Sequence, residues 1–254
     1  MSPKYIALRV SSFEDLDALP VTRMLANVTA KLDSSVFDAR DFDSRFDPVS
    51  PAGFAKYLEH FSVPVLLLGH LQGAALVRNY IGTTEGYQAF RDGKLLGAAL
   101  ISDPYRPQGH HLGSGDLSGM GMFGEGLRWP LAMPVYHLAH EGDIVTNAEP
   151  GSPLYDVKGL MDMFLTEPSR TPGSAHTYCW AEEASVDLTR RRWASEGLGT
   201  PTGKRLAKQY AKTITDLQNH HYGGLSTTAY LTPMPDSGET YIGYLARIIE
   251  ETWA

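Results

Sequence analysis

The sequence predicts an α/β fold in which helices flank a parallel β-sheet. Short apolar runs typical of buried strands recur through the first 150 residues, and helix-forming segments separate them. Leu71, Asp103 and Asp143 each follow one of these runs. In sheets of this kind functional groups gather at the carboxyl ends of the strands. We therefore expect these three positions to lie near the functional site.

The first half of the chain predicts strands and helices in alternation. Strands are expected at residues 5–10, 35–38, 64–68, 95–101 and 135–140, where apolar residues are concentrated. Helices are expected at residues 20–32, 52–61 and 74–80, where the apolar residues recur at helical spacing. Pro20 supports the first helix, because proline suits the first helical turn.

The second half of the chain predicts mainly helices. They are expected at residues 155–165, 204–218 and 240–253, with turn-rich breaks between the first two. Asp236 and Glu239 precede the last helix at the spacing of a capping box. We predict a core at residues 1–150, a helical linker or insertion at 151–230 and a C-terminal return helix of the core at 231–254.

Composition excludes several classes of protein. A formal net charge of −7 argues against a general nucleic-acid-binding surface. A single cysteine, Cys179, rules out an internal disulfide and a paired-cysteine metal site. Residues 1–5 lack the pattern of a secretory signal peptide, and no apolar run approaches the roughly 20 residues of a membrane span. We expect a protein made in a cytosol, with no membrane span.

A glycine-flanked turn follows the third predicted strand. Gly69-His70-Leu71-Gln72-Gly73 has the two glycines of the G-x-S-x-G nucleophile elbow, which holds a catalytic serine on a sharp strand-to-helix turn. The middle position carries Leu71 instead of serine. A leucine side chain has no lone pair and no exchangeable proton, so it cannot attack a carbonyl.

Three motifs resemble one family in the same order. Gly69 to Ala75 is similar to the Gly-Tyr-Ser-Gln-Gly-Ala elbow of cutinase-like serine esterases. Ser102-Asp103-Pro104, with Gly109 beyond it, resembles the segment after their next core strand. Residues 136–143 resemble the Tyr-Ala-His-Asp-Gly-Asp segment of the lysin B esterases of mycobacteriophages. The resemblance implies an α/β-hydrolase-like fold and a Ser-Asp-His triad.

The resemblance places the triad on degenerate positions. It implies Leu71 at the nucleophile position, Asp143 at the acid and a residue near Glu239 at the histidine. Because Glu239 fits a capping box, we expect no replacement base there. We expect Asp143 to cap the following turn or to pair with a base. Losing one triad member can cost on the order of 10⁶ in turnover, so no catalytic residues are expected.

The histidines suggest a metal site, but their spacing along the chain does not favour one. His110 and His111 lie in a glycine-rich loop, and His137 and His140 are three residues apart, on opposite faces of a strand. We expect no metal and no cofactor.

Arg190 to Trp193 forms a basic cluster, which is either a solvated helix face or a docking site for an acidic partner.

Two functional hypotheses follow. The first is an inactive hydrolase-fold protein that binds protein partners in an assembly, as a virion-associated minor capsid, decoration or tail component. A lipid or glycan pocket is a further possibility that the sequence leaves open. The second is an active, lysin B-like serine esterase acting on a cell-envelope ester, with a non-standard constellation. Its candidates are Ser11, Ser12 or Ser102 with His70, His110 or His140.

Overall fold

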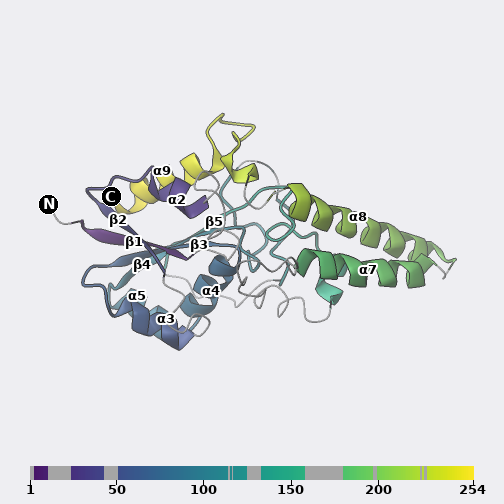
Figure 1. Ribbon diagram of the computed structural model, residues 1–254, viewed down its shortest axis with the longest axis horizontal. Helices are drawn as coiled ribbons and strands as arrows, with labels where there is room; N and C mark the ends of the chain where they lie inside the picture. The colour runs from purple at the N-terminus through teal and green to yellow at the C-terminus, as the bar shows by residue number, and fades with distance from the viewer. Residues whose placement is uncertain are drawn as a thin grey trace, which may run out of the picture.

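The protein folds around a five-stranded parallel sheet, seen in a computed structural model (Figure 1). The structure describes residues 3–10, 24–42, 51–113, 115, 117–124, 133–157, 180–196, 199–223, 225 and 228–254. The strands are β1 (Tyr5–Val10), β2 (Phe37–Asp41), β3 (Val65–His70), β4 (Leu95–Ile101) and β5 (Val135–Leu138). The helices are α2 (Met24–Thr29), α3 (Pro51–Leu58), α4 (Gln72–Ile81), α5 (Thr84–Arg91), η2 (Pro153–Asp156), α7 (Trp180–Glu196), α8 (Pro201–Gly223), η3 (Ala229–Leu231) and α9 (Tyr241–Trp253).

The strand order brings the predicted site positions to one edge of the sheet. The order is β2-β1-β3-β4-β5, and every pair is parallel. The backbone N–H of Leu71, after β3, donates to the carbonyl of Ile101. The N–H of Ser102, after β4, donates to the carbonyl of Leu138 at the end of β5. The α/β class and the flanked parallel sheet are therefore confirmed.

Helices cover both faces of the sheet, as Figure 1 shows. Side chains alternate along each strand, so every buried strand supplies both faces. On β3, Leu66 and Leu68 belong to the apolar cluster that includes α2 and α9. Val65 and Leu67 belong to the cluster that includes α3 and α4. Because both faces are covered, the strands are continuously apolar, which explains why the sequence predicted them well.

A helical hairpin forms the other end of the molecule. Helices α7 and α8 pack along each other and project away from the sheet (Figure 1). A third apolar cluster joins the hairpin to the core, with Leu71, Leu154, Leu188 and Leu217 among its members. The predicted domain limits at residues 150 and 230 stay a prediction. Within the described residues, no helix is both long and apolar enough to span a bilayer.

Several predicted elements differ from the structure. The second strand begins at Phe37 instead of residue 35, because N–H groups of residues 36 and 37 donate to the Asp33 carbonyl and hold a turn there. Helix α5 was missed because it is mostly polar; Thr83 caps it by accepting from the N–H of Gly86. Most of the helix expected at 155–165 lies outside the described residues.

The predicted capping box before the last helix is wrong. Thr240 is the N-cap of α9, and its Oγ1 accepts a 3.1 Å hydrogen bond from the N–H of Gly243. Asp236 and Glu239 precede the cap, where the chain still forms a turn. A threonine in the extended conformation directly before the first helical residue satisfies one of the orphan N–H groups of the helix without them.

Candidate functional site

The turn after β3 has the backbone of a nucleophile elbow. Leu71 has φ 51° and ψ −119°, a conformation that non-glycine residues rarely adopt, and α4 begins at the next residue, Gln72. A Cβ at Gly69 would lie 2.7 Å from the Cα of Ala74, so only glycine allows the strand and helix to approach this closely. The strained strand-to-helix turn is present without a serine at its apex.

The apex side chain is enclosed. Leu71 is 1% exposed and belongs to the apolar cluster that joins the sheet edge to the hairpin. That cluster also includes Tyr105 and Met122 from the loops after β4, and Tyr210 from α8. A nucleophile must reach its substrate, and the residue at this position contacts only the protein interior. The position serves packing between the core and the hairpin.

Asp143 is buried, and both of its carboxylate oxygens accept hydrogen bonds. Oδ1 accepts from the N–H of Val145 at 3.1 Å, which caps the turn after β5. Oδ2 accepts from the phenol of Tyr230 at 2.7 Å. Burial raises the pKa of Tyr230 well above its usual value, and the neighbouring Asp143 carboxylate raises it further. Tyr230 is thus a buried, protonated donor to the Asp143 carboxylate.

A second buried carboxylate lies under the elbow. Asp103 accepts from the N–H of Tyr105 through Oδ1 at 2.9 Å, and its Oδ2 lies 2.9 Å from Nδ1 of His137. Burial lowers the pKa of His137, and the charges of Arg78 and Arg106 lower it further, against the opposing effect of Asp103. Burial also lowers the pKa of Arg78 to about 10. His137 is therefore a neutral core histidine.

Arg106 holds the loops at the sheet edge together. Its side chain is fully buried, Nε donates to the carbonyl of Thr146 at 2.7 Å, and Nη2 donates to the carbonyl of Gly119 at 2.5 Å. Nη1 adds longer bonds to the carbonyls of Pro107 and His110. The guanidinium fork thus satisfies carbonyl groups from several loop segments at once. Sequence reasoning missed Arg106, because arginine in a polar loop normally indicates an exposed side chain.

The other predicted positions are dispersed. Glu239 lies near the surface, where Oε2 is 3.3 Å from Nη2 of Arg247, and it does not accompany Asp143. His70 and Gln72 are buried beside the elbow. No sequence signal singled out Tyr230, since a lone tyrosine before the last helix has no characteristic spacing.

The serines proposed as alternative nucleophiles are either buried or outside the described residues. Ser102 is fully buried at the end of β4, and its Oγ makes no hydrogen bond within the described part of the chain. Ser11 and Ser12 lie outside the described residues. His140 accepts from the N–H of Gly142 through Nδ1 at 3.1 Å, so this nitrogen is engaged.

Among the described residues, no three His, Cys, Asp or Glu side chains gather as metal ligands would.

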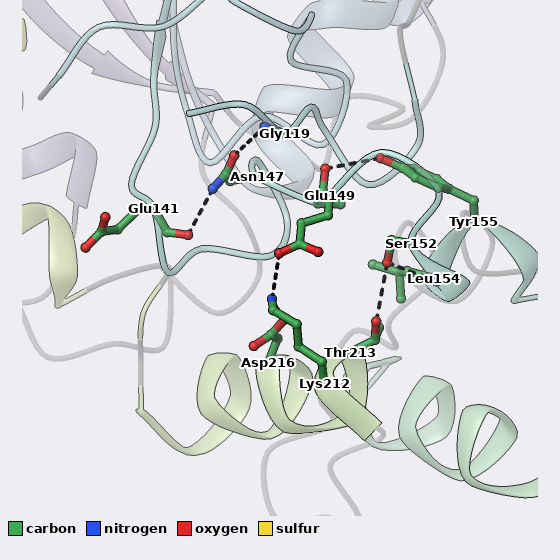
Figure 2. Close-up of polar contacts among 11 residues, drawn as sticks. Gly119, Glu141, Asn147, Glu149, Ser152, Leu154, Tyr155, Lys212, Thr213 and Asp216 are labelled. Carbon is green, nitrogen blue, oxygen red and sulfur yellow. Dashed lines mark hydrogen bonds and ion pairs between the residues drawn. The ribbon is translucent and has the colours of Figure 1, made fainter. Parts of the chain in front are cut away.

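A groove of about 280 Å³ lies between the loops after β5 and helix α8. Figure 2 shows Lys212 reaching from α8 to Glu149, with Nζ 3.1 Å from Oε1, while it also contacts Asp216 at 2.8 Å. Burial opposes the charge of Lys212, but its hydrogen bonds to both carboxylates outweigh this effect and raise its pKa. These three charged side chains therefore lie on the lining of the groove and join α8 to the loop after β5.

The core wall of the groove is rigidly built. The side chain of Asn147 accepts from the N–H of Gly119 at 3.1 Å and donates to the carbonyl of Glu141 at 3.0 Å (Figure 2). Asn147 thereby links two loops. The remaining lining mixes small apolar and polar side chains with the charged Glu141, Arg205 and Lys208, which suits a polar ligand.

The sheet order, the covered faces and the elbow together define an α/β-hydrolase-like fold. The chain is similar to the crystal structure of lysin B from Mycobacteriophage D29, with a TM-score of 0.54 and 12% sequence identity over 98% of this chain and 99% of that chain. At this identity the likeness shows the fold. No family model and no curated protein matches the sequence.

Proposed function

We propose that this hydrolase-fold protein has no esterase activity and serves in binding or assembly. The observation that carries the proposal is Leu71 at the apex of the elbow, where it is enclosed by apolar side chains. Acyl transfer needs a hydroxyl or thiol at this point and a base to take its proton. A buried leucine supplies neither.

The state of Asp143 supports the same proposal. In a triad the acid orients a histidine, which shuttles the proton. Here Asp143 binds the phenol of Tyr230, whose raised pKa makes it a poor base near neutral pH. Two of the three triad functions are therefore absent from the elbow and its acid.

The assembly role rests on analogy with the phage protein of similar fold. We propose a virion-associated component, such as a minor capsid, decoration or tail protein, made in the host cytoplasm. Protein partners are expected, and the groove beside α8 is the candidate place for a lipid or glycan ligand.

Two measurements test this proposal. Short-chain p-nitrophenyl esters should show no turnover above the uncatalysed rate, and the protein should co-sediment with purified particles. Turnover would overturn the loss of activity. A protein that stays free in the lysate and is absent from particles would overturn the assembly role.

The alternative is an active lysin B-like esterase with another constellation. Ser102 is the described candidate, since it has φ 54°, and strained backbone is common at functional sites. Its complete burial disfavours it. Turnover that is lost in Ser102→Ala and kept in Ser118→Ala, an exposed matched control, would establish this alternative.

A further inference from the structure

Charge is distributed very unevenly along this chain. Residues 188–212 carry seven Lys or Arg and a single acidic residue, Glu196, which gives this segment a net charge of +6. The whole chain has −7, so the remainder carries −13. Such an asymmetry points to a partner of negative charge that meets the basic segment alone.

The basic segment runs from the groove beside the core, which Arg205, Lys208 and Lys212 line, to the end of the helical hairpin that is far from the sheet. Helix α7 ends at Glu196 and α8 begins at Pro201, and these two helix ends lie at the far end of the projecting hairpin (Figure 1). Lys212 contacts Glu149 in the loop after β5, and Lys204 lies about 12 Å before Lys212 along the axis of α8, at about 1.5 Å per residue. This exceeds the Debye length of about 8 Å at physiological ionic strength, so an anionic partner beside Lys204 is largely screened from the loop that carries Glu149.

Most cations at the tip are available to a partner. Four exposed side chains in the basic segment form no ion pair within the described residues: Arg190, Lys204, Arg205 and Lys208. By contrast, Arg191 pairs with Asp187 on the same helix.

An exposed tryptophan accompanies these cations. Trp193 is 69% exposed, the most exposed large apolar side chain in the described part of the chain. It lies three residues after Arg190, so the two are neighbours on one face of α7. Val186 on the same helix is 46% exposed. A tryptophan beside arginine is typical of surfaces that sit at a membrane–water interface, where the indole enters the headgroup region.

We propose that the hairpin tip, defined as residues 186–196 and 199–208, which carry six Lys or Arg against Asp187 and Glu196, docks onto the surface of an anionic lipid bilayer. Lys and Arg side chains contact the lipid phosphates, and Trp193 inserts among the headgroups. The acidic core is repelled by the same surface, so the molecule binds with its hairpin foremost. A bilayer is flat, so the narrow hairpin tip can reach it while the acidic core stays away. Duplex DNA lying along α8 would instead bring its phosphates close to the acidic loop that carries Glu149. This proposal is independent of the loss of esterase activity.

The test is co-sedimentation of the full chain with vesicles. One set is phosphatidylcholine alone, and the other contains one quarter phosphatidylglycerol. We expect binding only to the anionic set, and loss of binding near 1 M NaCl, where the Debye length is about 3 Å. The double variant Arg190→Gln/Lys204→Gln should weaken binding about 25-fold, at about fivefold for each cation. Trp193→Ala alone should also weaken vesicle binding. It should remove the blue shift in tryptophan fluorescence that we expect when the wild type binds.

Matched controls lie on the core. Arg91→Gln/Lys94→Gln removes two exposed cations near α5, and Tyr87→Ala removes an exposed aromatic side chain. Both should bind like the wild type. Equal binding to both vesicle types, no binding, or an unaltered tip variant would overturn the proposal. Binding to duplex DNA without binding to vesicles would also overturn it. The same holds for salt-sensitive dimers, detected by sedimentation, if the protein does not bind vesicles.

Discussion

The phenol of Tyr230 donates a 2.7 Å hydrogen bond to Oδ2 of Asp143, and both side chains are fully buried. Tyr230 comes from η3, shortly before the last helix, and Asp143 comes from the turn after β5. The bond therefore ties the C-terminal part of the chain to the edge of the sheet. Where a triad would move a proton, this pair fixes structure.

Replacing Tyr230 with phenylalanine removes one donor from a buried carboxylate. We expect Tyr230→Phe to lower the free energy of unfolding by about 1.5–3 kcal/mol, the range for hydrogen bonds to charged groups. Urea unfolding monitored by circular dichroism measures this. Tyr87→Phe, on the exposed face of α5, is the control and should change stability by less than about 0.5 kcal/mol. Equal effects of the two changes would contradict a specific role for the pair.

Stability should fall at alkaline pH because buried tyrosines keep their protons in the fold. Burial raises the pKa of Tyr80 to about 12 and that of Tyr155 to about 12, and the pKa of Tyr230 is higher than usual for the same reason. Unfolded tyrosine titrates near pH 10. The folded pKa lies above the unfolded value, so this contribution is complete below about pH 10 and declines above it.

Unfolding titrations at several pH values between about 8 and 12 measure this decline. Tyr80→Phe should make the decline shallower, because one raised pKa is removed. A free energy of unfolding that stays constant across this range would show that the phenols are not held neutral by the fold.

Arg106 should be essential for the loops at the sheet edge. Arg106→Met keeps much of the volume but leaves the carbonyls of Thr146 and Gly119 without their donors. We expect a loss of about 3 kcal/mol or more, from two charge-assisted hydrogen bonds at about 1.5–3 kcal/mol each. Arg106→Lys should restore little, because an ammonium lacks the guanidinium fork.

Amide hydrogen exchange gives a local readout for the same change. The N–H of Met120, which bonds to the Ala148 carbonyl, should exchange faster in Arg106→Met. The N–H of Leu67 in the central strand should be affected only through the global loss of stability. Unchanged protection at Met120 would contradict the role of Arg106 in joining these loops.

The sequence predicted the elements whose cause is local or periodic. Continuous apolar runs identified β3 and β4, and the glycines at 69 and 73 located the elbow, since a Cβ at Gly69 would contact the Cα of Ala74. Helix α5 was missed because it is only eight residues long, and its few apolar side chains, Tyr87, Ala89 and Phe90, are too few to indicate a helix by spacing. Local patterns thus recover most of the sheet and its turns.

The site's polar contacts could not be predicted in the same way. Tyr230 and Asp143 are 87 residues apart, and Arg106 reaches carbonyls up to 40 residues away. Such partners depend on how the loops pack after the sheet has formed, and neither residue type signals its partner by spacing. For the same reason the resemblance gave the third triad position only as a residue near Glu239, whereas the hydrogen-bond partner of Asp143 in the structure is Tyr230.

Labelling with a fluorophosphonate probe, followed by intact-mass analysis, tests the absence of an activated serine most directly. We predict no adduct on the wild type and none on Leu71→Ser, because a serine at the elbow would still lack a histidine base beside Asp143. Leu71→Ala controls for the lost packing, which should cost both variants about 2–5 kcal/mol of stability. An adduct on a wild-type serine, or on the serine of the Leu71→Ser variant, would contradict the account.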